Sequence, residues 1–70
     1  MIKTAFKIDG MMCSMCEAHI NDAIRRNFNI KKVKSNHKKG LTIIESNDEI
    51  DLNHLKEVLD SLGYQLIGRE

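Results

Sequence analysis

Cys13 and Cys16 are the residues of this chain whose type and spacing could do chemistry. Thiolate sulfur binds soft metal ions and also exchanges disulfides, so a C-x-x-C pair has two chemical uses. Two sulfurs suffice for Cu(I), whereas structural zinc uses four closed ligands, and the 70-residue chain has only these 2 cysteines. The pair therefore predicts a site for one soft metal ion. Cu(I) is favoured, and Zn(II), Cd(II) and Hg(II) also accept thiolate.

The pair needs a strand and a helix to position it. Alternating apolar residues predict a strand over 2–8 that ends at a turn, Asp9-Gly10. A loop over 11–15 follows, and a helix begins at about Cys16. Cys13 would lie on the loop and Cys16 in the first helical turn, where the helix dipole and unpaired N–H groups favour thiolate. The helix has one apolar face, made of Ile20, Ala23, Ile24 and Phe28.

The rest of the chain predicts three more strands and a second helix. Asn29 would end the first helix in a left-handed conformation, before strands over 30–36 and 41–45 joined by a hairpin turn. Asp51 is the expected N-cap of the second helix, Gly63 ends it, and a strand over 64–67 closes the chain. The apolar stripe of this helix is Leu52, Leu55, Val58, Leu59 and Leu62.

This order predicts an α+β fold, a ferredoxin-like βαββαβ sandwich. It would have a four-stranded antiparallel sheet with two helices on one face, as one domain over residues 1–70.

The loop sequence resembles a known family. The stretch from Gly10 to Cys16 is similar to the G-M-x-C-x-x-C motif of heavy-metal-associated domains, and Leu62-Gly63-Tyr64 matches the end of their second helix. The family includes copper chaperones and the N-terminal domains of copper-transporting P-type ATPases. The resemblance covers essentially the whole chain and implies that Cys13 and Cys16 are the metal ligands. It also implies that Met11 packs under the loop and that Tyr64 lies beside it. Met12, Ser14 and Met15 are expected around the cysteines, the two methionines as partly exposed apolar cover that limits water at the site.

Met12 is a departure from the family pattern. Thr or Ser is common at this position, and zinc-preferring relatives often have Asp there. Met12 offers no oxygen ligand, which favours Cu(I). The expected function is therefore that of a non-enzymatic copper chaperone, which delivers Cu(I) to a copper-transporting P-type ATPase or a copper-responsive regulator.

Three other functions stay open. The chain could be the metal-binding domain of a P-type ATPase, although a start at Met1 and an end just after the last strand favour a free-standing protein. It could be a small thiol–disulfide oxidoreductase, but it has no proline and so lacks the cis-proline of thioredoxins. An RNA-binding module ranks last because the central strands lack aromatic residues for base stacking.

The charge pattern limits the partners. A net charge of +1 does not favour nucleic acid or a membrane surface, and no apolar run could span a membrane. The N-terminus lacks signal-peptide features, which predicts a cytoplasmic protein with reduced thiols.

Arg25 and Arg26 are the predicted docking residues for an acidic partner, and the nearby lysines are either docking residues or a solvated edge of the sheet. We expect a monomer without metal, with a metal-bridged dimer as the alternative.

The three histidines are predicted to lie outside the site. His19 would point down the first helix, away from the loop tip, and His37 and His54 have no evident partner.

Overall fold

Strand β1 (Ile2–Asp9) shows why the sheet has one buried and one open face. Phe6 and Ile8 are 0% and 3% exposed, whereas Lys3 and Lys7 are exposed. Successive side chains of a strand point to opposite faces, so the apolar set turns toward a single side. The computed structural model, which describes all residues from Met1 to Glu70, thus confirms the strand predicted over residues 2–8.

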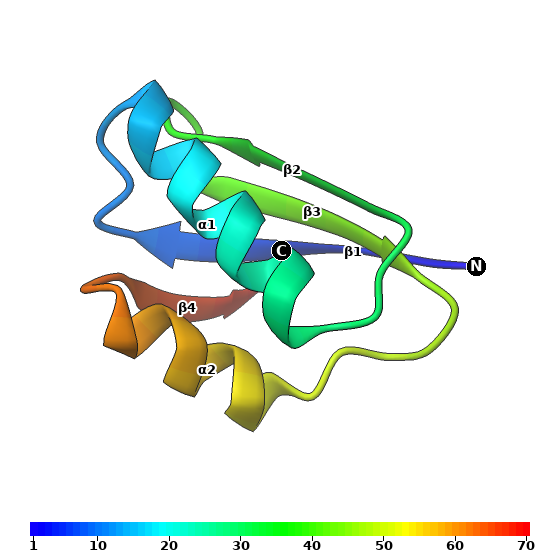
Figure 1. The fold of residues 1–70 in the computed structure, drawn as a ribbon. Coiled ribbons are helices and arrows are strands. Elements are labelled where there is room, and N and C mark those ends of the chain that lie inside the picture. The colour runs from blue at the N-terminus through cyan, green and yellow to red at the C-terminus, as the bar shows by residue number, and fades with distance from the viewer.

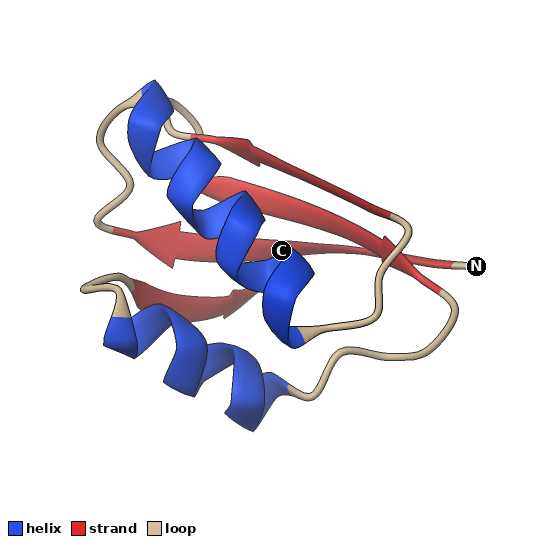
Figure 2. Ribbon diagram, viewed as in Figure 1, coloured by secondary structure: helices blue, strands red, loops and turns tan.

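Four antiparallel strands form one sheet in the order β2-β3-β1-β4. Both helices cover the same face of this sheet, and the other face is open (Figures 1 and 2). The predicted ferredoxin-like βαββαβ sandwich is confirmed, with β2 and β4 at the sheet edges. The remaining elements are α1 (Ser14–Asn27), β2 (Lys32–Asn36), β3 (Leu41–Ser46), α2 (Leu52–Ser61) and β4 (Gln65–Arg69).

The core lies between the sheet and the two helices. Helix α1 contributes Ile20 and Ile24, and helix α2 contributes Leu55 and Leu59, all fully buried. The apolar stripe of α2 is shorter than predicted, because Leu52 and Leu62 are 39% and 41% exposed. These two residues lie at the first position and the C-cap of the helix, beyond the part that packs on the core.

Helix α1 begins two residues earlier than predicted. Cys13 is already its N-cap, and the Cys13 carbonyl accepts the first helical hydrogen bond from the Glu17 N–H at 3.3 Å. Ser14 is therefore the first helical residue, and the predicted loop over 11–15 is shorter. Cys16 is in the first turn, as predicted.

The predicted left-handed stop at Asn29 is wrong, because no residue other than glycine has a positive φ. Helix α1 ends at Asn27, and its C-cap Phe28 is extended with φ −134°. The Asn27 side chain donates a hydrogen bond to the Ala23 carbonyl at 2.8 Å. The N–H of Phe28 donates to the Ile24 carbonyl at 2.9 Å, so the last helical hydrogen bond forms while the cap residue itself is extended and not left-handed.

The hairpin between β2 and β3 confirms the predicted turn at residues 37–40. Gly40 has φ +67°, and its carbonyl accepts a hydrogen bond from the Ile8 N–H at 2.8 Å. Both predicted edge strands start later than expected, at Lys32 for β2 and at Gln65 for β4.

Candidate metal site

The N-terminus of α1 brings the two cysteines together. Cys13 is the N-cap in an extended conformation, with φ −155° and ψ 172°, and Cys16 follows one turn later. Residues three apart on a helix lie on the same side, so the sulfurs converge. The two Sγ atoms are 3.3 Å apart and both thiols are free. This separation exceeds the ~2.05 Å of a disulfide bond and lets one metal ion contact both atoms.

The site is open to solvent. Cys13 is exposed and Cys16 is half-buried. Ser14 is exposed beside them, and the side chains of Met12 and Met15 are 83% and 68% exposed. The chain has no cluster of three or more His, Cys, Asp or Glu side chains that could hold a metal ion. The two sulfurs thus lie side by side at the surface, and no third residue of these types is clustered with them.

Met11 lies on the opposite side of the loop. Its side chain is 6% exposed and belongs to the same apolar cluster as Phe6 and Ile20. The thioether therefore anchors the loop to the core and does not face the solvent side.

Tyr64, near the C-terminal end of the chain, lies beside Gly10 at the start of the loop. A Cβ atom added to Gly10 would lie 3.4 Å from Cδ1 of the Tyr64 ring. Gly10 also has φ +98°, a conformation that L side chains rarely adopt. The glycine before the loop is thus needed both for its backbone conformation and for the close approach of the tyrosine ring.

The surroundings of Cys16 favour its thiolate form. Hydrogen bonding from the Tyr64 hydroxyl is the largest cause that lowers the pKa of Cys16 from 9.0 to about 7. The Met12 backbone and the Cys13 thiol lower this pKa further, and partial burial opposes them. The same contact raises the pKa of Tyr64 to about 12. The hydroxyl thus stays protonated at neutral pH, when a large fraction of Cys16 is ionised.

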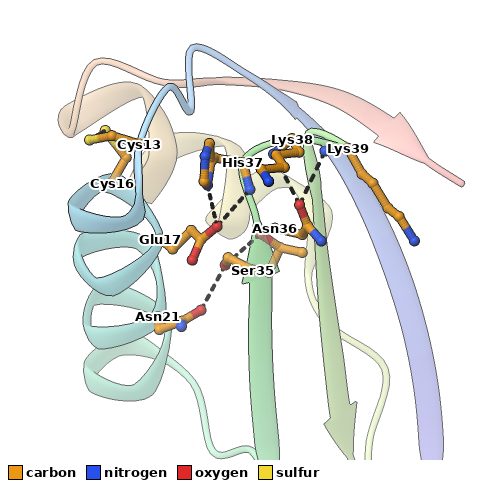
Figure 3. A network of polar contacts seen from close by, with 10 residues as sticks. Cys13, Cys16, Glu17, Asn21, Ser35, Asn36, His37, Lys38 and Lys39 are labelled. Carbon is orange, nitrogen blue, oxygen red and sulfur yellow. Dashed lines mark hydrogen bonds and ion pairs between the residues drawn. The ribbon is translucent and has the colours of Figure 1, made fainter.

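A contact that the sequence did not predict braces the turn of α1 that contains Cys16. His37, in the hairpin after β2, donates its backbone N–H to Oε2 of Glu17 at 2.8 Å, and its Nδ1 lies 2.6 Å from the same oxygen (Figure 3). This interaction corrects the expectation that His37 has no partner. Glu17 directly follows Cys16, so the brace holds the first turn of α1 against the hairpin.

The brace continues into a polar network that joins α1 to the sheet. Ser35 donates its hydroxyl hydrogen to Oδ1 of Asn21 at 2.7 Å and lies 2.8 Å from the Thr42 hydroxyl (Figure 3). Asn36 accepts hydrogen bonds from the backbone N–H groups of Lys38 and Lys39, which shapes the turn. The partners are up to 20 residues apart in sequence, so no local pattern indicates them.

The other predicted residues lie away from the sulfurs. Arg25 and Arg26 are in the last turn of α1, at the opposite end of the helix from Cys13. Arg25 is exposed and pairs with Asp22, with 3.4 Å between Nη1 and Oδ1. His19 is exposed on α1, and the ring of His54 packs at 4.6 Å from the ring of Phe28.

Known proteins share this sequence and fold. The chain is 31% identical over 65 residues to the copper chaperone CopZ of Enterococcus hirae, covering 91% of this chain and 94% of that protein. It is 29% identical over 65 residues to a mercuric reductase of Lysinibacillus sphaericus, covering 93% of this chain but only 12% of the reductase. A solved structure of a CopZ metallochaperone matches with a TM-score of 0.83 at 16% identity, covering 94% of this chain and all of that one.

Two further observations bear on the class of protein. Neither helix has the length and apolar character needed to cross a membrane. The model of the heavy-metal-associated domain matches residues 5–65, which include the whole Gly10–Cys16 loop and Tyr64. The chain therefore belongs to the family of heavy-metal-associated domains.

Proposed function

We propose that this chain carries one Cu(I) ion between Cys13 and Cys16 and passes it to a partner protein. The observation that supports this function best is the pair of free sulfurs, 3.3 Å apart at an exposed helix start. No His, Asp or Glu side chain is clustered with them. Cu(I) accepts two soft ligands, whereas zinc is usually held by four.

Transfer would proceed by exchange of thiolate ligands. A thiolate of the partner attacks the bound ion and forms a third sulfur–metal bond, after which the bond to exposed Cys13 breaks. A second partner thiolate then replaces Cys16, and the copper stays Cu(I) throughout. Because Cys13 is exposed, the partner sulfur can approach without unfolding the loop.

The sulfurs must separate slightly when they bind a metal in a line. A metal–sulfur bond of about 2.3 Å, the value for zinc thiolates, puts two collinear sulfurs ~4.6 Å apart. The exposed Cys13 side chain is free to rotate and supplies this change, while Tyr64 and the surrounding backbone hold Cys16.

Copper is the proposed cargo in preference to zinc or mercury. Similarity to a copper chaperone extends over most of both chains, whereas similarity to the mercuric reductase is limited to a small part of that enzyme. Met12 is exposed next to Cys13 and provides sulfur instead of an oxygen ligand. Zn(II), Cd(II) and Hg(II) are the competing ions, since each accepts thiolate.

The proposed partner is a copper-transporting P-type ATPase or a copper-responsive regulator, in the cytoplasm. We infer that the chain has no catalytic activity of its own and is a monomer without metal. Arg25 and Arg26 are proposed docking residues for a partner that extends along the length of α1. The alternative context, a metal-binding domain of such an ATPase, would use the same two sulfurs.

A Cu(I) titration against a copper-specific chelator under reducing conditions tests the function. The chain is expected to take up one Cu(I) per molecule, and Cys13→Ser and Cys16→Ser are each expected to lose tight binding. Met15→Leu is the matched control, because it removes an exposed sulfur from the same helical turn and should leave uptake unchanged. Uptake that persists in both cysteine variants would contradict the proposal, as would a preference for Zn(II) over Cu(I).

A thiol–disulfide oxidoreductase is the second candidate, favoured by the lowered pKa of Cys16, about 7. An insulin reduction assay with a dithiol donor separates the two functions. A chaperone is expected to be inactive in this assay.

A further inference from the structure

A groove of about 560 Å³ lies at the end of the molecule opposite the two cysteines. It is lined by Lys3 at the start of β1, Arg25 in the last turn of α1 and residues 30–34 around the start of β2. The cysteines lie beyond the other end of β1 and at the other end of α1 (Figure 1). This groove, the far-end groove, is therefore separate from the metal site.

Basic side chains line the far-end groove, and all of them except Arg25 are unpaired. None of its four lysines takes part in any ion pair of the structure. Glu45 is the one acidic residue in the lining, and it stands between Lys3 and Lys32 in the register of the sheet. The lining therefore carries a net positive charge, with five basic side chains and one carboxylate. Its cations are Lys3, Arg25, Lys31, Lys32 and Lys34.

Apolar side chains and a free strand edge complete the groove. Val33 is 8% exposed and lies on the sheet face opposite to that of Lys32 and Lys34, where it forms the recessed apolar floor of the groove. Half-buried Ile43 pairs with Lys34 and lies on the lysine face, and Ile30 is also half-buried. Strand β2 is an edge strand and pairs with β3 only. Its outer side offers backbone N–H and C=O groups to an added strand.

We propose that the far-end groove binds an extended acidic segment of a partner protein, which adds to the edge of β2. In such a segment, acidic side chains on one face contact the lysines, and apolar side chains on the other face reach the recessed floor. The alternation of exposed Lys32 and Lys34 with buried Val33 and Ser35 matches the two-residue period of an extended chain.

Other occupants fit the groove less well. Nucleic acid is disfavoured because the lining has no aromatic side chain for base stacking and includes Glu45. A lipid surface is disfavoured because the apolar floor is recessed and cannot enter a bilayer. A second copy that pairs β2 with β2 would bring the lysines of both strands together, which is repulsive.

Binding at this end would leave the cysteines free. A partner held by its acidic segment stays close to Cys13 and Cys16, so its own thiolates reach the metal at a high effective concentration. This use in metal transfer rests on the proposed function, whereas binding of the acidic segment does not require metal.

Fluorescence anisotropy with a labelled ten-residue peptide that alternates Glu and Val tests the inference on the reduced, metal-free protein. We expect micromolar affinity that falls with salt, because the contacts are charged. The double variant Lys32→Glu/Lys34→Glu is expected to bind at least ~10-fold more weakly, a loss of ~1.4 kcal/mol. The matched control, Lys38→Glu/Lys39→Glu, changes the charge equally but lies in the hairpin near the metal loop, and should bind the peptide as the unchanged chain does.

Amide chemical shifts of the unchanged chain give a second measurement that does not depend on the folding of a variant. Shifts at residues 30–34 and 43–45 on addition of the peptide are expected, and shifts confined to Gly10–Cys16 would overturn the inference. The inference would also be overturned if both double variants weakened peptide binding equally, or if the unchanged chain did not bind the peptide. It would be overturned as well if the chain bound phosphatidylserine vesicles more tightly than the peptide, or if it self-associated through the same groove. Cu(I) uptake of Lys32→Glu/Lys34→Glu should stay normal, so failure of this inference is distinct from failure of the proposed function.

Discussion

The two helices begin in opposite ways. Helix α2 begins at Asp51, whose carboxylate accepts hydrogen bonds from the backbone N–H groups of Asn53 and His54 at 3.0 and 3.3 Å. Helix α1 begins at Cys13, whose side chain makes no capping hydrogen bond. Both N-caps are extended, and both accept the first helical hydrogen bond through their carbonyls. The two helix starts therefore differ only in the side chain of the N-cap, which forms capping hydrogen bonds at Asp51 and none at Cys13.

This difference separates a helix start that stabilises the fold from one that is available for binding. A carboxylate cap satisfies backbone donors and typically contributes about 1 kcal/mol to stability. Cys13 leaves the donors of α1 and the positive end of its dipole without an internal acceptor. This positive end stabilises the negative charge of a thiolate. The thiolates in turn would bind a cation placed between them. The N-terminus of α1 therefore lacks the stabilisation that a side-chain cap would contribute to the fold.

Giving α1 the cap of α2 is the strongest test of this comparison. Cys13→Asp is expected to abolish tight Cu(I) uptake, because only one sulfur remains. The same change should stabilise the metal-free chain by about 0.5–1 kcal/mol, since the carboxylate can accept the free N–H groups. Chelator competition and urea denaturation measure the two effects. Cys13→Ala is the control that loses copper without the gain in stability, and equal stability of the two variants would refute the capping argument.

Removing the cap of α2 should have the reverse result. Asp51→Ala is expected to lower the free energy of unfolding by ~1 kcal/mol, which corresponds to a fall in Tm of roughly 4–8 °C in a domain of this size. Cu(I) uptake should not change, because α2 begins away from the sulfurs. Thermal unfolding followed by circular dichroism gives the Tm. Asp51→Asn keeps an accepting oxygen and should retain most of the stability.

The pH dependence of stability sharpens the comparison at α1. The folded pKa of Cys16 is lowered from 9.0 to about 7, chiefly by Tyr64, so the unfolded chain binds more protons between these values. The stabilisation from the thiolate is complete above pH 9 and is lost as the pH falls through about 7. Tyr64→Phe removes the hydroxyl and is expected to raise the pKa of Cys16 and to flatten this rise in stability between pH 7 and 9.

Ultraviolet absorbance of the thiolate measures the pKa directly, and denaturation at several pH values measures the stability. Cys16→Ser is the control that has no thiolate and should show no such slope from this residue. An unchanged thiolate titration in Tyr64→Phe would show that the hydroxyl does not stabilise the thiolate.

The brace between α1 and the hairpin should give the smallest effect. Hydrogen bonds from His37 lower the pKa of Glu17 below its ordinary value of 4.5, so the brace stabilises the fold above that pH. This contribution is lost as the pH falls through the lowered pKa. Glu17→Gln is therefore expected to lose less stability on acidification than the unchanged chain does. Glu57→Gln, on the exposed side of α2, is the control, and matching acid profiles in all three chains would disprove the effect.

Much of the fold was predictable because its signals are local. The alternation of Phe6 and Ile8 with lysines defines a strand, and the N-cap Asp51 defines a helix start. The ends of α1 were predicted less well. Cys13 is an unusual N-cap, and α1 ends at an extended Phe28 instead of the left-handed residue expected at Asn29. The residue at which a helix begins or ends depends on side-chain hydrogen bonds that compete with the helical backbone bonds, and a hydrophobic pattern does not reveal these bonds.

The sequence by itself determined the pair of thiols, their one-turn spacing and the glycine that precedes them, since covalent order fixes which residues share a helical turn. Only the tertiary structure decided what surrounds the pair. The family resemblance placed Tyr64 beside the loop, but its effect on Cys16 and the contact of His37 with Glu17 come from elements distant in sequence. The lysines of the far-end groove likewise gather from β1, β2 and the loop before β2. The physical reason is that sheet order and helix packing set these contacts, and both depend on how the whole core closes.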